Sequence, residues 1–241
     1  MSRLVQSPGV VIRRMNYRES SMIVDLLTES HGLIGGIVSG VRQRKPRMSP
    51  VLFTPGYVLD VVFYENDPGK LWRIKEAAMK NRYDRIPFDI VRGNTALCIC
   101  ELIKKMVHSH NPNPAFFDFV TRYLSLLDQI ENPGNILVHF LIHFSIHMGF
   151  EPKERDGEDH IYFDLRTGWF RDHSPGHPMV LDIRISELLY QLLKSDLDQL
   201  VEVKMSRKDR QKLTEGLIDF IRYHSDSFSQ IRSFEVLKKL W

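Results

Sequence analysis

Three histidines spaced four residues apart, His139, His143 and His147, are the side chains of this sequence whose arrangement most suggests a metal site. The spacing places all three on one face of a helix, where paired imidazoles can chelate a metal ion. An enzyme built on them would be a metal-dependent nuclease. A HExxH site, however, needs a carboxylate between its histidines as general base, and none is present. We therefore interpret the triplet as a polar seam against neighbouring helices or as a surface that faces a partner.

A second histidine set, His160, His173 and His177, lies in the segment 151–183. A structural zinc ion needs four cysteine or histidine donors, and this segment contains no cysteine. The run HIYFDLRTGWF at 160–170 predicts a β-hairpin that turns at 166–168. We expect it to be free of metal and to pack through four aromatic residues: Tyr162, Phe163, Trp169 and Phe170.

Other catalytic patterns are absent from the sequence. There is no GxxxxGK[ST] loop for nucleotide phosphates and no GxSxG elbow for a nucleophilic serine. The two cysteines, Cys98 and Cys100, are two residues apart and would diverge on a helix, so they fit ordinary core roles in a reducing compartment. We predict a binding and scaffolding factor with no catalytic residue, no metal and no cofactor, rather than an enzyme.

Positive charge is concentrated in one short segment. Residues 42–47 carry four cations and no acid, and residues 1–80 contain 12 Lys or Arg against 7 Asp or Glu. Residues 81–241 contain 21 against 23, so the excess of positive charge belongs to the first third of the chain. Such asymmetry is typical of a module that binds a polyanion, either nucleic acid or an anionic membrane.

The composition is that of a globular chain, with 43% hydrophobic and 26% charged residues. No window approaches the roughly 18 consecutive apolar residues of a membrane span, and the N-terminus lacks the apolar core of a signal peptide. We expect a cytoplasmic protein.

The elements that must position these residues fall into two parts. Between Val10 and about Met79 the chain contains five β-like segments separated by turn residues: GVVIRR, SMIVDLLT, LIGGIVSG, PGYVLDVVFYE and KLWRIKEAAM. The Asn-Asp-Pro-Gly run at 66–69 predicts a hairpin turn, and Gly35 with Gly36 predicts a bent strand or bulge. Five strands that close into a barrel are typical of an OB-fold.

After Pro87 the apolar spacing becomes helical. We predict helices over 90–110, 115–130 and 135–150, with Asn-Pro pairs at their boundaries, and further helices over 185–195, 206–225 and 233–241. The predicted fold class is α+β: an N-terminal five-stranded OB-fold barrel at 1–80, then an α-helical domain at 81–241 with a small hairpin insertion at about 151–183.

Four motifs then occur in a fixed order along nearly the whole chain. They are residues 9–42 with Tyr17, Glu19, Ser20, Thr28, Gly32 and Gly40, then Glu101-Leu102, Gly149-Phe150-Glu151-Pro152, and residues 232–237. In this order and spacing the chain resembles the RecO family of bacterial recombination and repair mediators. Many members carry a four-cysteine zinc site after the third helix, and this chain departs from them there.

The resemblance implies DNA binding, strand annealing, and cooperation with RecR and single-strand-binding protein in loading RecA. Both single- and double-stranded DNA are expected ligands, and no membrane is. The alternative is an OB-fold interaction adaptor that binds RNA or protein without annealing strands.

With DNA implied, the charge map predicts where it binds. The basic segment would lie between the third and fourth strands, beside the groove of the barrel. The candidate DNA-binding residues are Arg13, Arg14, Arg18, Arg42, Arg44, Lys45 and Arg47. Strand alternation puts Arg13 and Arg14 on opposite faces, so at most one should line the groove. Bases could stack on Tyr17, Tyr57, Tyr64 or Trp72, although each could equally belong to the core.

A partner site is predicted on the helical domain. The resemblance implies that this domain binds the acidic, aromatic-ended tail of single-strand-binding protein. Such a tail needs an apolar pocket with cations at its rim. The candidates are Lys104, Lys105 and Arg122, each of which could equally be a solvated surface charge.

Overall fold

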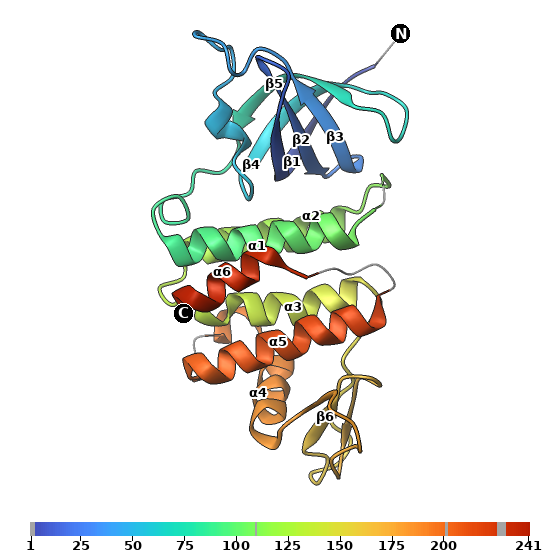
Figure 1. The fold of residues 1–241 in the computed structure, drawn as a ribbon. Coiled ribbons are helices and arrows are strands. Elements are labelled where there is room, and N and C mark those ends of the chain that lie inside the picture. Colours follow the sequence, from blue (N-terminus) through green and yellow to red (C-terminus); the bar gives the residue numbers. More distant parts are fainter. Residues whose placement is uncertain (1–2, 109, 201, 226–229) are drawn as a thin grey trace. The chain divides into compact units, whose positions relative to one another are not determined.

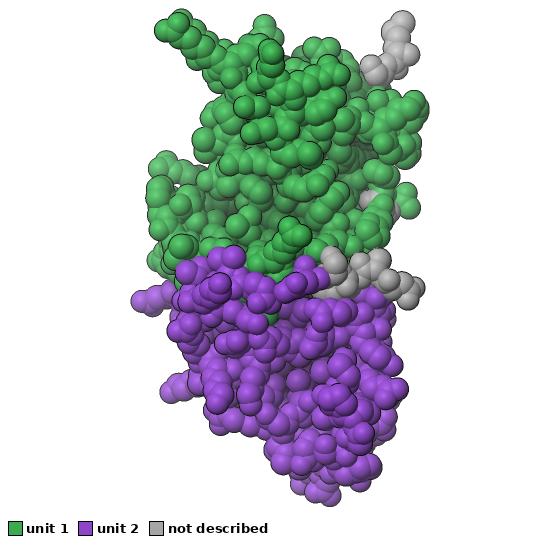
Figure 2. Space-filling view, in the orientation of Figure 1, with its two compact units in different colours: residues 1–129, 231–234 green, residues 130–230, 235–241 purple. Residues whose placement is uncertain are grey.

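The computed structural model describes residues 3–108, 110–200, 202–225 and 230–241. These residues form two compact units, coloured separately in Figure 2. Unit 1 comprises residues 1–129 with 231–234, and unit 2 comprises residues 130–230 with 235–241.

Unit 1 contains the predicted barrel (Figure 1). Its five strands close in the order β1-β2-β3-β5-β4, and all neighbours are antiparallel except β3 and β5. The strands are β1 (Leu4–Tyr17), β2 (Ser21–Thr28), β3 (Gly32–Val38), β4 (Val58–Tyr64) and β5 (Trp72–Met79). The predicted OB-fold is confirmed, and the 66–69 run lies between the paired strands β4 and β5, with Gly69 at φ +82°.

Strand β1 begins five residues earlier than the predicted segment. Its first half pairs with β4 from Leu4 to Val10, and its second half pairs with β2 from Gly9 to Tyr17. A strand that closes a barrel must pair on both sides along its length. This requirement extends β1 beyond the stretch that local apolar alternation marks.

The two glycines of β3 do not mark a bulge, so that alternative of the prediction is wrong. β2 and β3 pair without a register shift, and the shifts occur instead between β1 and β2 and between β4 and β5. A Cβ on Gly36 would lie 2.8 Å from Cδ1 of Ile74, a buried residue of β5. Glycine is needed here because the Ile74 side chain approaches the β3 backbone closely.

Two helices of unit 1 follow the barrel, α1 (Ile90–Met106) and α2 (Pro114–Gln129). Asp89 begins α1, because its Oδ1 accepts hydrogen bonds from the backbone N–H groups of Val91 and Arg92 at 2.9 and 3.1 Å. α1 packs against β1, where Sγ of Cys100 lies 3.6 Å from the carbonyl oxygen of Val11.

Both cysteines are buried and unpaired on α1. Burial raises the pKa of the Cys98 and Cys100 thiols to about 12, so both stay protonated and unreactive. The expected core role is confirmed.

Unit 2 is built on three helices, α3 (Ile136–His147), α4 (Ile183–Lys194) and α5 (Arg207–His224). α3 is buried over most of its surface and packs against α5, as its nearly continuous apolar sequence predicts. Short 3₁₀ turns η2 (Pro133–Asn135) and η3 (Leu197–Gln199) precede α3 and follow α4, and helix α6 (Arg232–Leu240) ends the chain. No helix of the described residues is long and apolar enough to cross a membrane.

The predicted hairpin exists and gains a third strand. β6 (Tyr162–Asp164) pairs with β7 (Trp169–Arg171) and with β8 (Val180–Leu181), in the order β7-β6-β8. Phe163 and Phe170 are buried as expected, but Trp169 is 43% exposed, so its predicted packing role is wrong. Alternation explains the difference, because Trp169 lies next to Phe170 in β7 and must point to the other face.

Candidate nucleic-acid interface

The basic segment 42–47 lies in the connection between β3 and the 3₁₀ turn η1 (Pro50–Phe53). The connection is held at both ends by buried apolar residues, Val41 and Phe53. Its four cations, in contrast, are all exposed. The barrel therefore presents a segment that carries positive charge and no acid, and buried residues fix the connection on both sides of this segment.

Two hydrogen bonds attach the start of this segment to the turn between β1 and β2. The backbone N–H of Arg42 donates to the carbonyl of Ser20 at 3.1 Å, and its Nη1 donates to the carbonyl of Arg18 at 3.3 Å. Arg18 has a φ of 51°, and among the described residues it is the one non-glycine with positive φ. The tertiary structure thus brings Arg18 and Arg42 together, although 24 positions separate them in the sequence.

The neighbouring cations of β1 have different surroundings. Nη1 of Arg14 donates to the carbonyl of Pro50 at 2.9 Å, which places it at the other end of the basic segment. Nε of Arg13 donates instead to Oδ2 of Asp25 at 2.7 Å. Arg14 therefore lies at the far end of the connection that carries the basic segment, whereas Arg13 is paired with a carboxylate.

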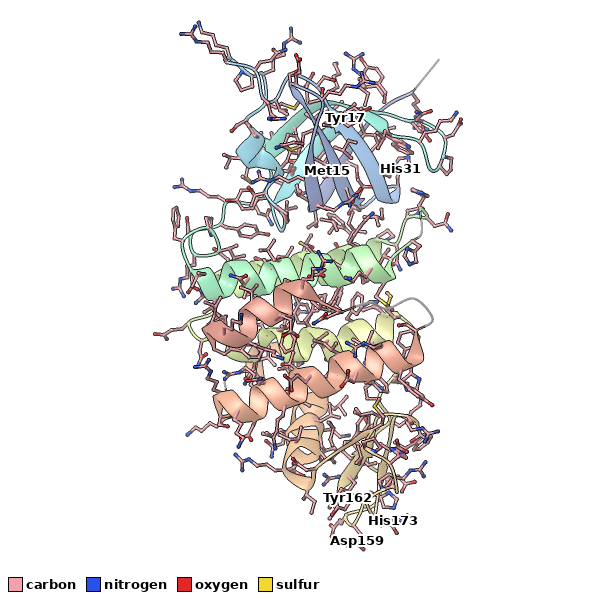
Figure 3. All side chains as sticks on the ribbon, in the orientation of Figure 1. Met15, Tyr17, His31, Asp159, Tyr162 and His173 are labelled. Carbon is pink, nitrogen blue, oxygen red and sulfur yellow. The ribbon has the colours of Figure 1, made fainter. Side chains whose placement is uncertain are left out.

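The four aromatic candidates for base stacking divide into two pairs. Tyr57 and Trp72 are buried, and the Trp72 ring contacts Phe63 in the barrel core. Tyr17 and Tyr64 are half-buried, and Tyr17 lies on the barrel in Figure 3 with the Arg18 guanidinium 5.1 Å from its ring centre. The core interpretation therefore holds for Tyr57 and Trp72, and Tyr17 remains beside the basic surface.

The three candidate partner residues do not share one environment. Nζ of Lys104 lies 3.1 Å from Oδ2 of Asp25, the same oxygen that binds Arg13. Lys105 lies 3.7 Å from Glu101, and Arg122 is exposed on α2.

Glu101 also organises the start of α6. Its carboxylate accepts hydrogen bonds from the backbone of Arg232 and from the backbone and hydroxyl of Ser233. Burial opposes ionisation of Glu101, but these bonds and the charge of Lys105 leave its pKa below the ordinary value. Lys105 therefore belongs to a structural cluster within unit 1.

Of the histidine triplet, His139 and His143 contact each other as the predicted polar seam would, whereas His147 is exposed. Nε2 of His139 lies 3.2 Å from the carbonyl oxygen of Ser195 and 3.2 Å from Nε2 of His143. Burial, and then the proximity of His143, lower the pKa of His139 to about 4. Burial also lowers the pKa of His143 and of His147. The lowered pKa values favour the neutral form of all three imidazoles at pH 7.

Each histidine of the second set lies beside a carboxylate. His160 lies 3.8 Å from Asp156, His173 lies 2.5 Å from Asp172, and His177 lies 3.5 Å from Asp164. Figure 3 shows His173 at one end of this region. Across the part of the chain that the structure describes, no three His, Cys, Asp or Glu side chains are arranged to hold a metal ion.

An apolar groove of unit 1 was not found by sequence reasoning. It has a volume of about 620 Å³, and its wall contains four exposed apolar side chains: Val51, Phe88, Ile90 and Leu97. Phe88 is 86% exposed, the largest exposure among them. One feature of the sequence could have indicated the groove. Phe88 directly follows Ile86-Pro87 in a connector that has neither helical nor strand periodicity, so core packing does not explain an aromatic residue there.

The groove wall is held by one buried carboxylate, that of Asp128. It accepts hydrogen bonds from the backbone N–H groups of Asp84, Arg85 and Ile86 at 2.9, 2.8 and 2.8 Å. Burial opposes its ionisation, but the three bonds lower the pKa of Asp128 below its ordinary value. The connector before Phe88 is therefore fixed rather than free.

Comparison with known proteins agrees with this architecture. The family model for the N-terminal part of recombination protein O matches residues 1–83, and the model for its C-terminal part matches residues 87–230. The DNA repair protein RecO of Phocaeicola vulgatus is 27% identical over 242 residues, which covers 99% of each chain. The RecO proteins of Flavobacterium psychrophilum and Porphyromonas gingivalis are 27% and 23% identical, and the alignments cover at least 98% of each chain.

The two family models together match most of the chain. The first covers the closed barrel, and the second covers most of the helical region. The chain therefore belongs to the RecO family of DNA repair proteins.

Proposed function

We propose that this protein binds single- and double-stranded DNA through the basic surface of its barrel and promotes the annealing of complementary strands. The observation that carries the proposal is the exposed, acid-free segment 42–47, anchored to the β1–β2 turn through Arg42 and flanked by Arg14 and Arg18. In a five-stranded OB-fold, the loops beside the barrel groove bind oligonucleotides.

Annealing follows from charge screening. Two strands repel each other through their phosphates, and cations that neutralise phosphates release condensed counterions and lower that repulsion. A surface that screens two strands at once brings them together without making or breaking a covalent bond. No catalytic residue or cofactor is required, so the proposed role is that of a mediator rather than an enzyme.

We further propose that the protein cooperates with RecR and with the tail of single-strand-binding protein in loading RecA in the cytoplasm. In this proposal residues 1–80 bind DNA, and residues 81–241 bind partners. Arg122 is the most accessible of the three candidate cations, because Lys104 and Lys105 lie beside Asp25 and Glu101. The support for these partners is membership of the family.

An annealing assay tests the central proposal. Two complementary labelled oligonucleotides are mixed with the full chain, and their pairing is followed by energy transfer at low and high salt. We expect faster pairing at low salt and little acceleration at high salt, since phosphate contacts are lost as salt rises. A protein that binds DNA but leaves the pairing rate unchanged would instead be the OB-fold adaptor.

The tail proposal has its own test. A labelled peptide with the acidic, Phe-ended tail sequence is titrated with the full chain, and a second peptide lacks the terminal Phe. We expect binding that requires this Phe and weakens when Arg122 is replaced by Ala. Equal binding of both peptides would indicate charge attraction to the basic segment instead of an apolar pocket.

A further inference from the structure

We infer that the groove beside Phe88 receives unstacked bases of a single DNA strand whose phosphates are held by the basic surface. The inference rests on the proposed function and extends it, because it identifies where the bases go. Four apolar residues of the groove are exposed: Phe88 by 86%, Ile90 by 66%, Val51 by 61% and Leu97 by 41%. Large apolar side chains that gather in this way on a protein surface mark an interaction site.

The groove is preformed on both walls. On one wall, Asp128 binds the backbone of 84–86, and the N–H of Phe88 donates to the carbonyl of Arg85 at 3.0 Å. On the other wall, the hydroxyl of Thr54 donates to the carbonyl of Val51 at 2.8 Å. A ring held on a fixed backbone can stack on a ligand with little loss of conformational entropy.

The charge of the groove itself is balanced, which suits the uncharged base of a nucleotide. The groove is lined by residues of the stretches 51–57 and 86–97, and the charged residue in its lining is Asp89. This acid has a cation beside it, because Asp89 lies 3.3 Å from the buried Arg92.

The basic surface and the groove are continuous. Arg14 donates to the carbonyl of Pro50, and the next residue, Val51, lines the groove. A phosphate held at Arg14 therefore lies one residue away from an apolar wall. This order of cation followed by apolar surface matches a nucleotide, which carries one phosphate charge and one flat base.

A single strand fits this arrangement better than a duplex or a peptide does. In a duplex the base faces are stacked on one another, so they cannot reach Phe88 without costly unstacking. An acidic peptide with an aromatic residue could also enter the groove. The charged residue in the groove lining is, however, Asp89, whose carboxylate repels the acids of such a peptide and has no such effect on an uncharged base.

The test compares Phe88→Ala with the unaltered full chain, using a labelled 20-nucleotide thymidine strand and a 20-base-pair duplex as probes. We expect about a tenfold weaker affinity for the single strand, as loss of one base–aromatic stack implies, and less than about a twofold change for the duplex. The salt dependence of single-strand binding should be unchanged, because no cation is removed. Phe88→Trp should restore the affinity, whereas Phe88→Leu should restore it only in part.

A matched control is Ile183→Ala, which removes an apolar residue that is 47% exposed at the start of α4. It should leave binding of both probes unchanged. Because Phe88 is almost fully exposed, its replacement should not unfold the chain, and a thermal melt checks this.

Four outcomes are distinguishable. Loss of single-strand binding in Phe88→Ala with duplex binding retained supports the inference. If Phe88→Ala binds both probes normally while replacement of the basic segment weakens both, the groove inference is wrong and DNA binding stands. If Phe88→Ala loses affinity only for an acidic Phe-ended peptide, the groove is a binding site for a protein. If the unaltered chain binds neither probe, the proposed function itself fails.

Discussion

Nε of Arg13 lies 2.7 Å from Oδ2 of Asp25, in the strand paired with its own. Asp25 is buried, with 6% of its surface exposed, and the same oxygen also accepts an ion pair from Lys104 of α1 at 3.1 Å. Two cations that the sequence assigns to different ligands, DNA and a protein tail, therefore share one carboxylate within unit 1. This pairing joins the barrel to helix α1 and offsets part of the charge of Arg13.

The pairing predicts that two adjacent arginines contribute unequally to DNA binding. Replacing Arg14 by Ala should flatten the log–log salt dependence of single-strand binding by about 0.7, the value of one phosphate contact. Replacing Arg13 by Ala should change it by less than about 0.3, because its charge already has a partner. Fluorescence titrations at four salt concentrations measure both, and equal changes in the two variants would argue against the difference.

The basic segment predicts a larger effect. Joint replacement of Arg42, Arg44, Lys45 and Arg47 by Ala should flatten the same dependence by roughly two units, if about three of them contact phosphate. All four are exposed, so the melting temperature should stay close to that of the unaltered chain. An unchanged salt dependence in the folded variant would remove this segment from the DNA site.

Asp128 predicts a change in stability and in its acid dependence. Asp128→Ala should lower the free energy of unfolding at pH 7 by about 3 kcal/mol, because three backbone donors lose a charged acceptor. The folded-state pKa of Asp128 is lowered, so its contribution is present above the unfolded value of about 4 and is lost as pH falls through the folded value. Urea titrations at pH 7 and pH 3 should therefore show a smaller difference between the two proteins at pH 3. A difference that stays constant with pH would mean that the carboxylate charge is not what stabilises the connector.

His139 predicts loss of stability in mild acid. Its folded pKa is about 4 and its unfolded value is about 6.5, so the unfolded chain binds more protons between these values and stability falls as pH falls through this window. Between pH 7 and pH 5 the unaltered chain should lose about 2 kcal/mol more than His139→Gln does. His143 and His147 remain in both proteins and titrate in the same direction, so they cancel in the comparison to first order. Equal losses in the two proteins would show that proton uptake at position 139 does not oppose folding.

The missing cysteines predict that the purified protein carries no stoichiometric zinc. Elemental analysis after dialysis against a mild chelator should give far less than one zinc per chain, and the melting temperature should not change on chelation. One zinc per chain would make His160, His173 and His177, or the triplet on α3, the leading ligands. Replacing each set in turn by Asn would then show which one holds it.

Much of the fold follows from local patterns in the sequence. The alternation in β2 and β4, the 3.6-residue period of α2 and α5, and the turn residues at 66–69 each act within a few positions, and the structure contains all of these elements. The predicted hairpin was also local and is present, whereas β8 was missed because a two-residue strand has no period to detect. The first residues of β1 were missed because their pairing depends on barrel closure.

The candidate site depended more on tertiary structure. The sequence by itself determined the acid-free run at 42–47, its position between two strands and the absence of cysteine from 151–183. Only the tertiary structure decided that Arg14 contacts the connection that carries this run, that Asp25 holds both Arg13 and Lys104, and that Phe88 lines a groove together with Val51. The ion pairs of Asp25 join residues that lie 12 and 79 positions apart in the chain. Hydrophobic periodicity depends only on residues close in sequence, so it does not indicate which distant side chains come into contact.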